Sequence, residues 1–150
     1  MARWQDVVDS EPEFATAVRA LFDARRHKTI ATLRKDGSPR ISGIECEFRD
    51  GEVVFGSMTG ARKVDDLRRD SRLALHSPSV DPPDGPDPTV WLGDAKLSGR
   101  AVDITPTGSD SFAYRIDINE VVLTKVGGMD HLVVQLWRPG APLKTMRNYN

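Results

Sequence analysis

Apolar side chains recur at a helical spacing near the start of the chain, which predicts an amphipathic helix over about 11–25. The residues at i, i+4, i+7 and i+8 are Phe14, Val18, Leu21 and Phe22. Ser10 is expected to be the N-cap, because Glu13 stands at the reciprocal position of a capping box. Pro12 is compatible with the first turn of such a helix.

After this helix the pattern changes to short β-rich segments separated by turn residues. Strands are predicted over Thr29–Leu33, Ile41–Phe48 and Glu52–Met58. Asp36–Gly37 and Asp50–Gly51 separate them, and each pair suits a type I′ turn, whose two central residues need positive φ. The three segments therefore predict an antiparallel meander.

The second half of the chain continues this pattern after one more helix. Pro78–Pro88 is too rich in proline for a regular element and is expected to be an exposed excursion. Gly127–Gly128 is expected to be a turn, and the polar tail 141–150 to be mobile. The other predicted elements are a short helix within 59–70 and strands over 72–77, 95–104, 112–118 with 121–126, and 132–137 as the last strand.

Six or seven antiparallel strands with two short helices indicate a mainly β protein whose sheet closes into a small barrel, because closure removes exposed edges. The length of 150 residues fits one domain over 1–150. Side chains fill the interior of so small a barrel. A sizeable ligand would then bind on the outside, or where two barrels meet.

Composition and sequence patterns argue against several classes of function. Lys plus Arg number 21 against 22 Asp plus Glu, a balance without the basic excess of a nucleic-acid binder. Neither a membrane-spanning run nor a signal peptide is evident, so the expected location is the cytoplasm. Cys46 is expected to be a structural thiol, and His27, His76 and His131 lack the spacing of metal ligands, so no metal is expected.

The sharpest chemical signal is Ala61-Arg62-Lys63 at the start of the second predicted helix. The first N–H groups of a helix have no partner within it and favour an anion. Arg62 and Lys63 add positive charge, and Ser57 and Thr59 offer hydroxyls just before them. The segment is a candidate phosphate site, and a solvated helix start is the alternative.

The order and spacing of these motifs resemble the pyridoxamine 5′-phosphate oxidase-like family, the FMN-binding split β-barrel group. The matching segments are Asp36–Arg40, Asp50–Gly51, Phe55–Ser57, Arg62–Leu67 and Asp70–Leu75. The resemblance implies a six- to seven-stranded antiparallel split β-barrel with two short helices. It also implies FMN as the cofactor, with the deazaflavin F420 as the alternative, because the family includes enzymes of both kinds.

The family also implies roles for particular residues. Arg62 and Lys63 match the positions that hold the flavin phosphate, whereas Ala61 lacks the hydroxyl found there in the family. Ser57 matches the hydroxyl residue that ends the third strand and faces the flavin, and Thr59 lies two residues on. The cofactor phosphate is therefore expected beside these side chains.

Further positions follow from the same resemblance. Arg40 matches an arginine that reaches the flavin ring system, and Ile41 and Ser42 are expected to lie along the ring. Trp137 and Arg147 reproduce the ten-residue spacing of a tryptophan and an arginine near the flavin. No catalytic residue can be named from this pattern.

The implied function is a flavin-dependent oxidoreductase that transfers hydride through FMN at a homodimer interface and acts on a small molecule. Leu143 stands where the true oxidases have an arginine for the substrate phosphate, which argues against pyridoxamine phosphate oxidation. A non-enzymatic flavin- or haem-binding module is a second possibility, since one fold can serve several functions. An interaction domain without cofactor is a third, because Ala61 lacks the hydroxyl.

Overall fold

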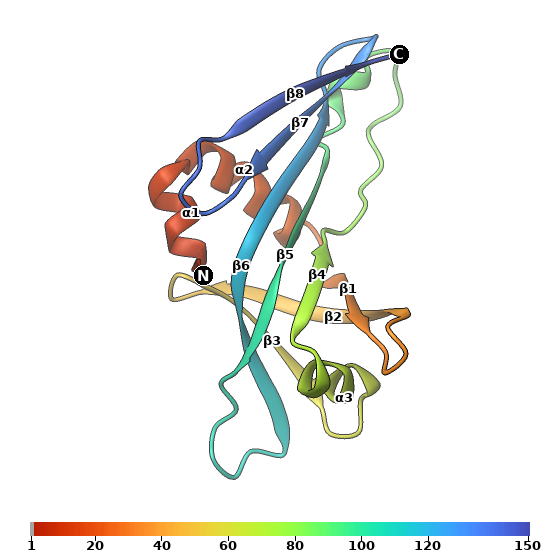
Figure 1. Ribbon diagram of the computed structural model, residues 1–150. Coiled ribbons are helices and arrows are strands. Elements are labelled where there is room, and N and C mark those ends of the chain that lie inside the picture. Colours follow the sequence, from red (N-terminus) through yellow and green to blue (C-terminus); the bar gives the residue numbers. More distant parts are fainter. Residues whose placement is uncertain (1) are drawn as a thin grey trace.

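The computed structural model of the protein describes residues 2–150 and consists mainly of antiparallel strands (Figure 1). The helices are α1 (Trp4–Ser10), α2 (Pro12–Asp23), α3 (Arg62–Arg69) and the short 3-10 helix η1 (Pro88–Val90). The strands are β1 (His27–Leu33), β2 (Pro39–Arg49), β3 (Glu52–Met58), β4 (Arg72–His76), β5 (Asp94–Asp103), β6 (Ser111–Val126), β7 (His131–Trp137) and β8 (Lys144–Tyr149).

The strands form one sheet in the order β3-β2-β1-β4-β5-β6-β7-β8, and β3 also pairs with β6. This last pairing closes six strands into the antiparallel barrel that the sequence predicts. The first part of β6 pairs with β3, and its second part, from Val121, pairs with β7. β7 and β8 therefore extend the sheet beyond the barrel, on one side of it (Figure 1).

The two predicted hairpin turns differ. Asp50–Gly51 has positive φ at both residues, 53° and 74°, as a type I′ turn requires. At the other turn only Gly37 has positive φ, and residues 34–38 lie outside the strand pairing, so that type I′ prediction is wrong. The carboxylate of Asp36 accepts hydrogen bonds from the backbone N–H and the hydroxyl of Ser38, which stabilises a longer loop.

The predicted helix 11–25 is α2, but its start differs from the prediction. Ser10 is the last residue of α1, a helix that the sequence did not predict, and Glu11 is the N-cap of α2 without a side-chain hydrogen bond. The Ser10 hydroxyl donates to the Asp6 carbonyl and accepts from the indole of Trp137. It is thus engaged away from the N-terminus of α2, and the predicted capping box is wrong.

The tail is the other correction to the predicted elements. Residues 144–149 were expected to be mobile and instead form β8, which pairs with β7 from Leu136 back to His131. Nearly all its side chains are exposed, so no apolar alternation marks it as a strand. Main-chain pairing with β7 holds it in place. The proline-rich excursion is as predicted, with only η1 at its end.

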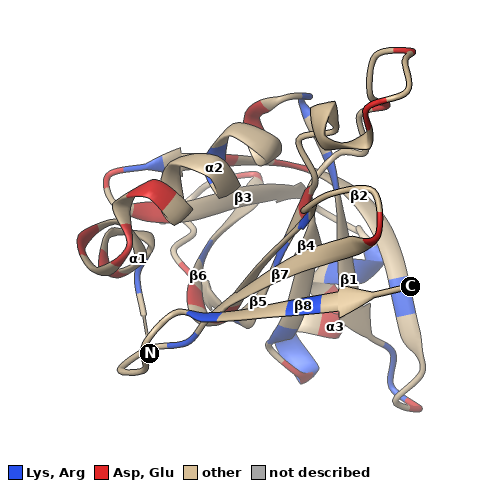
Figure 2. Cartoon of the chain, turned by 90° about the horizontal axis from the view of Figure 1, so that it is seen from above, with Lys and Arg blue, Asp and Glu red and all other residues tan. Residues whose placement is uncertain are grey.

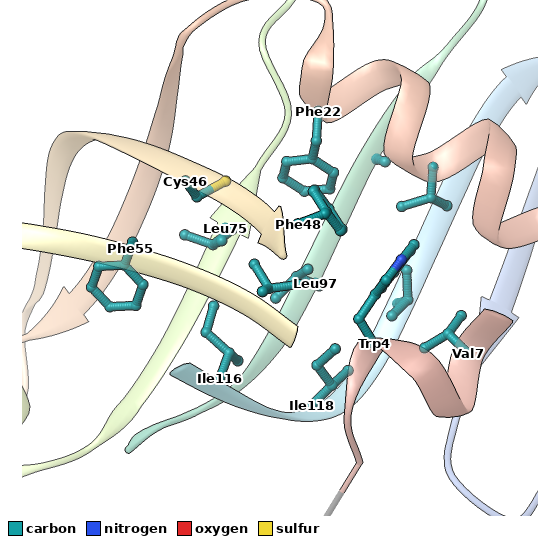
Figure 3. Close-up of a cluster of buried hydrophobic side chains, with 14 of the residues drawn as sticks. Trp4, Val7, Phe22, Cys46, Phe48, Phe55, Leu75, Leu97, Ile116 and Ile118 are labelled. Carbon is teal, nitrogen blue, oxygen red and sulfur yellow. The ribbon is translucent and has the colours of Figure 1, made fainter. Parts of the chain in front are cut away.

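The core lies inside the barrel and beneath α1 and α2 (Figure 3). Trp4 of α1 meets Phe48 of β2 edge to face at 4.7 Å, and Phe55 of β3 stacks on Tyr114 of β6 at 5.2 Å. Such aromatic contacts hold α1 against β2 and β3 against β6. Within residues 2–150 no helix is long and apolar enough to cross a membrane.

Candidate functional site

A groove of about 750 Å³ lies on the outer face of the barrel, over β2, β3 and β6. Side chains of a strand alternate between its two faces, and three outward positions here carry small residues: Gly43 on β2, Gly56 on β3 and Ala113 on β6. Gly56 pairs directly with Ala113 across the two strands. Small residues at these positions leave a shallow floor in the middle of the groove.

The backbone does not require glycine at Gly43. A Cβ atom built there would meet no atom within 4 Å, and its φ lies outside the positive range. Glycine weakens a strand interior, because it packs no side chain and loses more chain entropy on folding. Neither close packing nor backbone conformation therefore requires the glycine at this position, and its effect is to leave the floor of the groove open.

The walls of the groove are partly apolar. Met58, 79% exposed at the end of β3, and Ile104, 41% exposed after β5, both line it. Ile41 is 75% exposed on the outer face of β2, two residues before Gly43. Large apolar side chains exposed near one groove are the usual sign of a ligand or partner surface.

The groove also carries charged groups. Lys63, at the start of α3, lines it, and His27 and Glu45 of the β1–β2 pair line it as well. Ala61 is the N-cap of α3 and provides no side-chain hydrogen bond, so the first N–H groups of the helix lack a capping side chain. Lys63 and this helix start together can hold an anion.

The structure separates the two basic residues of the predicted phosphate site. Lys63 lines the groove, whereas Arg62 lines a second hollow of about 710 Å³ between α3 and the β1–β2 turn. Neighbouring residues on an α-helix project about 100° apart, because a turn takes about 3.6 residues. Of these two residues, Lys63 therefore lies in the groove and Arg62 does not.

The two hydroxyls before α3 have different surroundings. Ser57 belongs to the groove lining, but its hydroxyl oxygen is buried and has no hydrogen-bond partner among the residues that the structure describes. The Thr59 hydroxyl donates to the carbonyl of Asp110 and so ties the end of β3 to the start of β6. Ser57 lies between the outward-facing Gly56 and Met58, so its unpartnered hydroxyl is on the inward face of β3, whereas Thr59 has a structural contact.

Arg40, predicted near the ring of a cofactor, lines the second hollow and not the groove. Its Nε lies 2.7 Å from Oδ2 of Asp66, a carboxylate that is 2% exposed. Asp66 also accepts hydrogen bonds from the Thr32 hydroxyl and from Arg69. Ser42 is half-buried on the same face of β2 as Arg40.

These contacts set the ionisation of Asp66. Burial opposes its charged form, yet the hydrogen bonds from Arg40, Thr32 and Arg69 outweigh burial, and the pKa of Asp66 lies below its ordinary value. A carboxyl with a lowered pKa in the folded state stabilises the fold above its unfolded pKa, near 4. That stabilisation is lost as the pH falls through the folded pKa.

We expect the Asp66→Asn variant to lose less stability than the wild type on acidification below about pH 4. The amide takes up no proton on unfolding, whereas the Asp66 carboxylate does. Urea unfolding at several pH values between about 2 and 5 measures the slope of the unfolding free energy against pH. Equal slopes for the two proteins would contradict the ion-pair assignment of Asp66.

Trp137 and Arg147, the other predicted residues, lie outside both hollows. Trp137 is 3% exposed, and its Nε1 donates to the Ser10 hydroxyl at 2.8 Å. Arg147 is exposed on β8, opposite Val133 of β7. Within one copy of the chain, the structure does not bring these two side chains to the groove.

Cys46 has the structural environment that the sequence predicts. It is buried in the core, and this burial raises the pKa of its thiol to about 11. The thiol therefore stays protonated at neutral pH and is a poor nucleophile. Among residues 2–150, no three His, Cys, Asp or Glu side chains lie where they could hold a metal ion.

The sequence did not single out the groove floor or Asp66. Gly43 and Gly56 interrupt otherwise β-rich segments, and a glycine within a strand is a recognised sign of close backbone approach by another group. That signal could have found the floor. Asp66 carries no such signal, since its burial depends on where α3 docks against β1.

The structure is a six-stranded antiparallel barrel with a groove on its outer face. A family model described as pyridoxamine 5′-phosphate oxidase matches residues 14–120, and the chain belongs to this family. The match covers α2, β1 to β5 and the first part of β6, and so includes every strand that lines the groove. A search among curated proteins finds no match.

Several solved structures share the fold. A pyridoxamine 5′-phosphate oxidase-related, FMN binding protein from Nostoc punctiforme PCC 73102 has 12% identity and a TM-score of 0.63, covering 100% of this chain and 98% of that one. An F420 reductase has 14% identity and a TM-score of 0.53, covering 69% and 94%. A heme binding protein from Mycobacterium smegmatis has 18% identity and a TM-score of 0.54, covering 87% and 56%.

Proposed function

We propose that the groove binds a flavin-type cofactor with a phosphate group, FMN or the deazaflavin F420, and that the protein is an oxidoreductase. The observation that carries this proposal is the open floor at Gly43, Gly56 and Ala113, with Lys63 beside it. A planar ring needs such a floor, and a phosphate needs such a cation. The groove volume of about 750 Å³ is within the usual range for cofactor sites.

The residues present fit such a group. Lys63 and the uncapped N–H groups of α3 would hold the phosphate. Met58 and Ile104, which line the groove, would cover apolar parts of the ring system and exclude water, and Ile41 is exposed on the same face of β2 as Gly43. The cofactor itself supplies hydride transfer when bound, and the protein supplies binding and orientation.

The groove is open to solvent in one copy of the chain, and its walls expose Met58 and Ile104. We propose that a second copy closes it, so that two equivalent grooves lie at a twofold interface. In such a dimer, Arg147 on β8 of one copy could reach the groove of the other copy, although it lies away from the groove of its own chain.

Leu143 supports a substrate other than pyridoxamine phosphate. It is half-buried and packs against the core, so no cation for a substrate phosphate is present at this position. An apolar side chain cannot replace the charged hydrogen bonds that such a phosphate needs.

A haem-binding module is the second candidate. His27 lines the groove and is exposed, so its imidazole is available as an iron ligand. A heme binding protein also shares the fold. The two candidates differ in what they bind, and one titration separates them.

We expect the purified protein to bind FMN or F420, measured by absorbance and fluorescence titration, and Lys63→Ala to bind the same cofactor about 10- to 150-fold more weakly. The loss corresponds to one charge-assisted contact of about 1.5–3 kcal/mol. Lys96→Ala, exposed on β5 and outside both hollows, is the matched control and should bind as the wild type does.

The outcomes separate the candidates. Binding of FMN identifies a flavoprotein, and binding of F420 alone identifies a deazaflavin enzyme. Binding of hemin alone, lost in His27→Ala, would favour the haem module. If none of the three binds, or if Lys63→Ala binds FMN and F420 as tightly as the wild type does, the proposal is wrong.

A further inference from the structure

Two carboxylates beside the groove floor have no role in holding the proposed cofactor. Glu45 and Glu47 follow Gly43 on the outward face of β2, and both line the groove. Their side chains are 60% and 70% exposed. Charged residues of both signs are spread over the helices, strands and loops (Figure 2), and the effect of a charge falls with distance. The electrostatic potential at the floor therefore depends mainly on the charges that line the groove.

The strand register places Glu45 directly beside the floor. Strand β2 pairs with β3 up to Cys46, and in the continued register Glu45 stands opposite Gly56. Neighbouring strands lie about 4.8 Å apart, and two residues along a strand span about 7 Å, the separation of Glu45 from Gly43. Glu47 is two residues farther from Gly43. A ring that rests on the floor would therefore lie within about 10 Å of the Glu45 carboxylate.

The cations that line the groove balance these carboxylates only in part. His27 stands opposite Glu45 on β1, with its Nε2 3.5 Å from Oε1 of Glu45, and carries charge only when it is protonated. Arg49 lies 3.7 Å from Glu47. Lys63, at the start of α3, would hold the cofactor phosphate. Among residues 2–150, Glu45 therefore has no permanently charged partner.

Arg40 does not bring positive charge to the floor. The resemblance to the family implies that it reaches the flavin ring, but it lines the second hollow, where its Nε donates to Oδ2 of Asp66 at 2.7 Å. The oxidised ring of a flavin-type cofactor is neutral, whereas the reduced ring carries a negative charge at its pyrimidine end. Carboxylates beside the floor therefore disfavour the reduced ring more than the oxidised one.

We propose that Glu45, assisted by Glu47, lowers the reduction potential of the cofactor in the groove and so favours hydride donation to a substrate over hydride removal from one. This inference rests on the proposed flavin-type cofactor. Reduction of the bound ring takes two electrons and one proton and leaves one negative charge. Two unit charges about 10 Å apart, at an effective dielectric constant of about 20, change such an equilibrium by about 10-fold. The class of reaction is therefore the reduction of an electron-poor acceptor.

The reduction potential of the bound cofactor tests the proposal. The protein with bound FMN, or with F420 if it binds F420 alone, is reduced slowly by xanthine and xanthine oxidase, with methyl viologen as mediator and a redox dye of known potential. We expect the Glu45→Gln/Glu47→Gln variant to favour the reduced form about 10-fold more than the wild type does, which raises the two-electron potential by about 30 mV. Glu45→Gln alone should give most of this shift, because Glu45 is nearer the floor.

Ionic strength provides a second measurement of the same effect. The shift should be largest at about 0.01 M salt, where the Debye length is about 30 Å, and should shrink at about 1 M salt, where it is about 3 Å. A shift that does not depend on salt would point to a change in packing and would contradict an electrostatic role of the two carboxylates.

Glu13→Gln is the matched control, because it makes the same change at an exposed residue of α2 outside the groove. It should leave the potential of the cofactor unchanged. Equal shifts in Glu13→Gln and Glu45→Gln would show a diffuse effect of net charge and overturn the proposal. An unchanged potential in the Glu45→Gln/Glu47→Gln variant would overturn it as well.

Cofactor affinities separate this inference from the proposed function. The double variant should bind the oxidised cofactor within about 2-fold of the wild type and the reduced cofactor about 10-fold more tightly, since only the reduced ring is charged. If the wild type binds neither FMN nor F420, the proposed function fails and this inference fails with it. If a cofactor binds and its potential does not move, only this inference fails. Both carboxylates are exposed, and a thermal melt checks that the variants fold.

Discussion

Replacing Gly43 by leucine should abolish cofactor binding in the groove, with a loss of at least about 100-fold in affinity. A Cβ atom at this position meets nothing within 4 Å, so the added side chain projects into the open groove. It would occupy the space that a planar ring needs. Titration with FMN and F420 measures the loss.

The same substitution should leave the fold intact, and this separates a blocked groove from a damaged protein. An exposed strand position without close neighbours changes stability by no more than about 0.5 kcal/mol. Ala74→Leu on β4 is the control, because it adds a leucine at an exposed strand position outside the groove. Wild-type cofactor affinity in Gly43→Leu, with an unchanged melting temperature, would refute the assignment of the groove.

Replacing Asp66 by alanine should destabilise the protein by about 3 kcal/mol. This is at the lower end of the range for removing one member of a buried ion pair, because Arg40 and Arg69 keep some access to water. The Thr32 hydroxyl, which is buried, also loses its acceptor. Urea unfolding near neutral pH measures the change.

Asp65→Ala provides the comparison for this prediction. Asp65 is the neighbouring carboxylate on α3, is exposed and makes no ion pair within residues 2–150. Its loss should cost no more than about 1 kcal/mol, through the helix dipole alone. If Asp65→Ala and Asp66→Ala destabilise the protein equally, the hydrogen bonds of Asp66 do not hold α3 against the barrel.

Arg62 and Lys63 line two different hollows. In the sequence these two neighbouring residues form one motif, and the resemblance to the family implies that both bind the same phosphate. On the helix they project in different directions, Lys63 into the groove and Arg62 into the second hollow. Measuring the cofactor affinities of Arg62→Ala and Lys63→Ala separately would show how much each side chain contributes, which a double variant would combine.

The sequence predicted the elements whose signals are local. Alternating apolar side chains mark the barrel strands, and Asp50–Gly51 fixes a two-residue hairpin because both residues have positive φ. β8 was missed because its side chains are exposed and only pairing with β7 makes it a strand. The start of α2 was misplaced because the Ser10 hydroxyl bonds Trp137, 127 residues later in the chain.

By itself, the sequence determined the antiparallel barrel and its approximate strand order along the chain, since periodicity and turn chemistry act over a few residues. The family was indicated by the resemblance of its motifs. Only the tertiary structure decided the site. Pairing of β3 with β6 places Gly56 beside Ala113, and the docking of α3 buries Asp66 against Thr32 and Arg40. Such contacts join residues far apart in sequence, and their energies depend on burial and geometry that no local pattern contains.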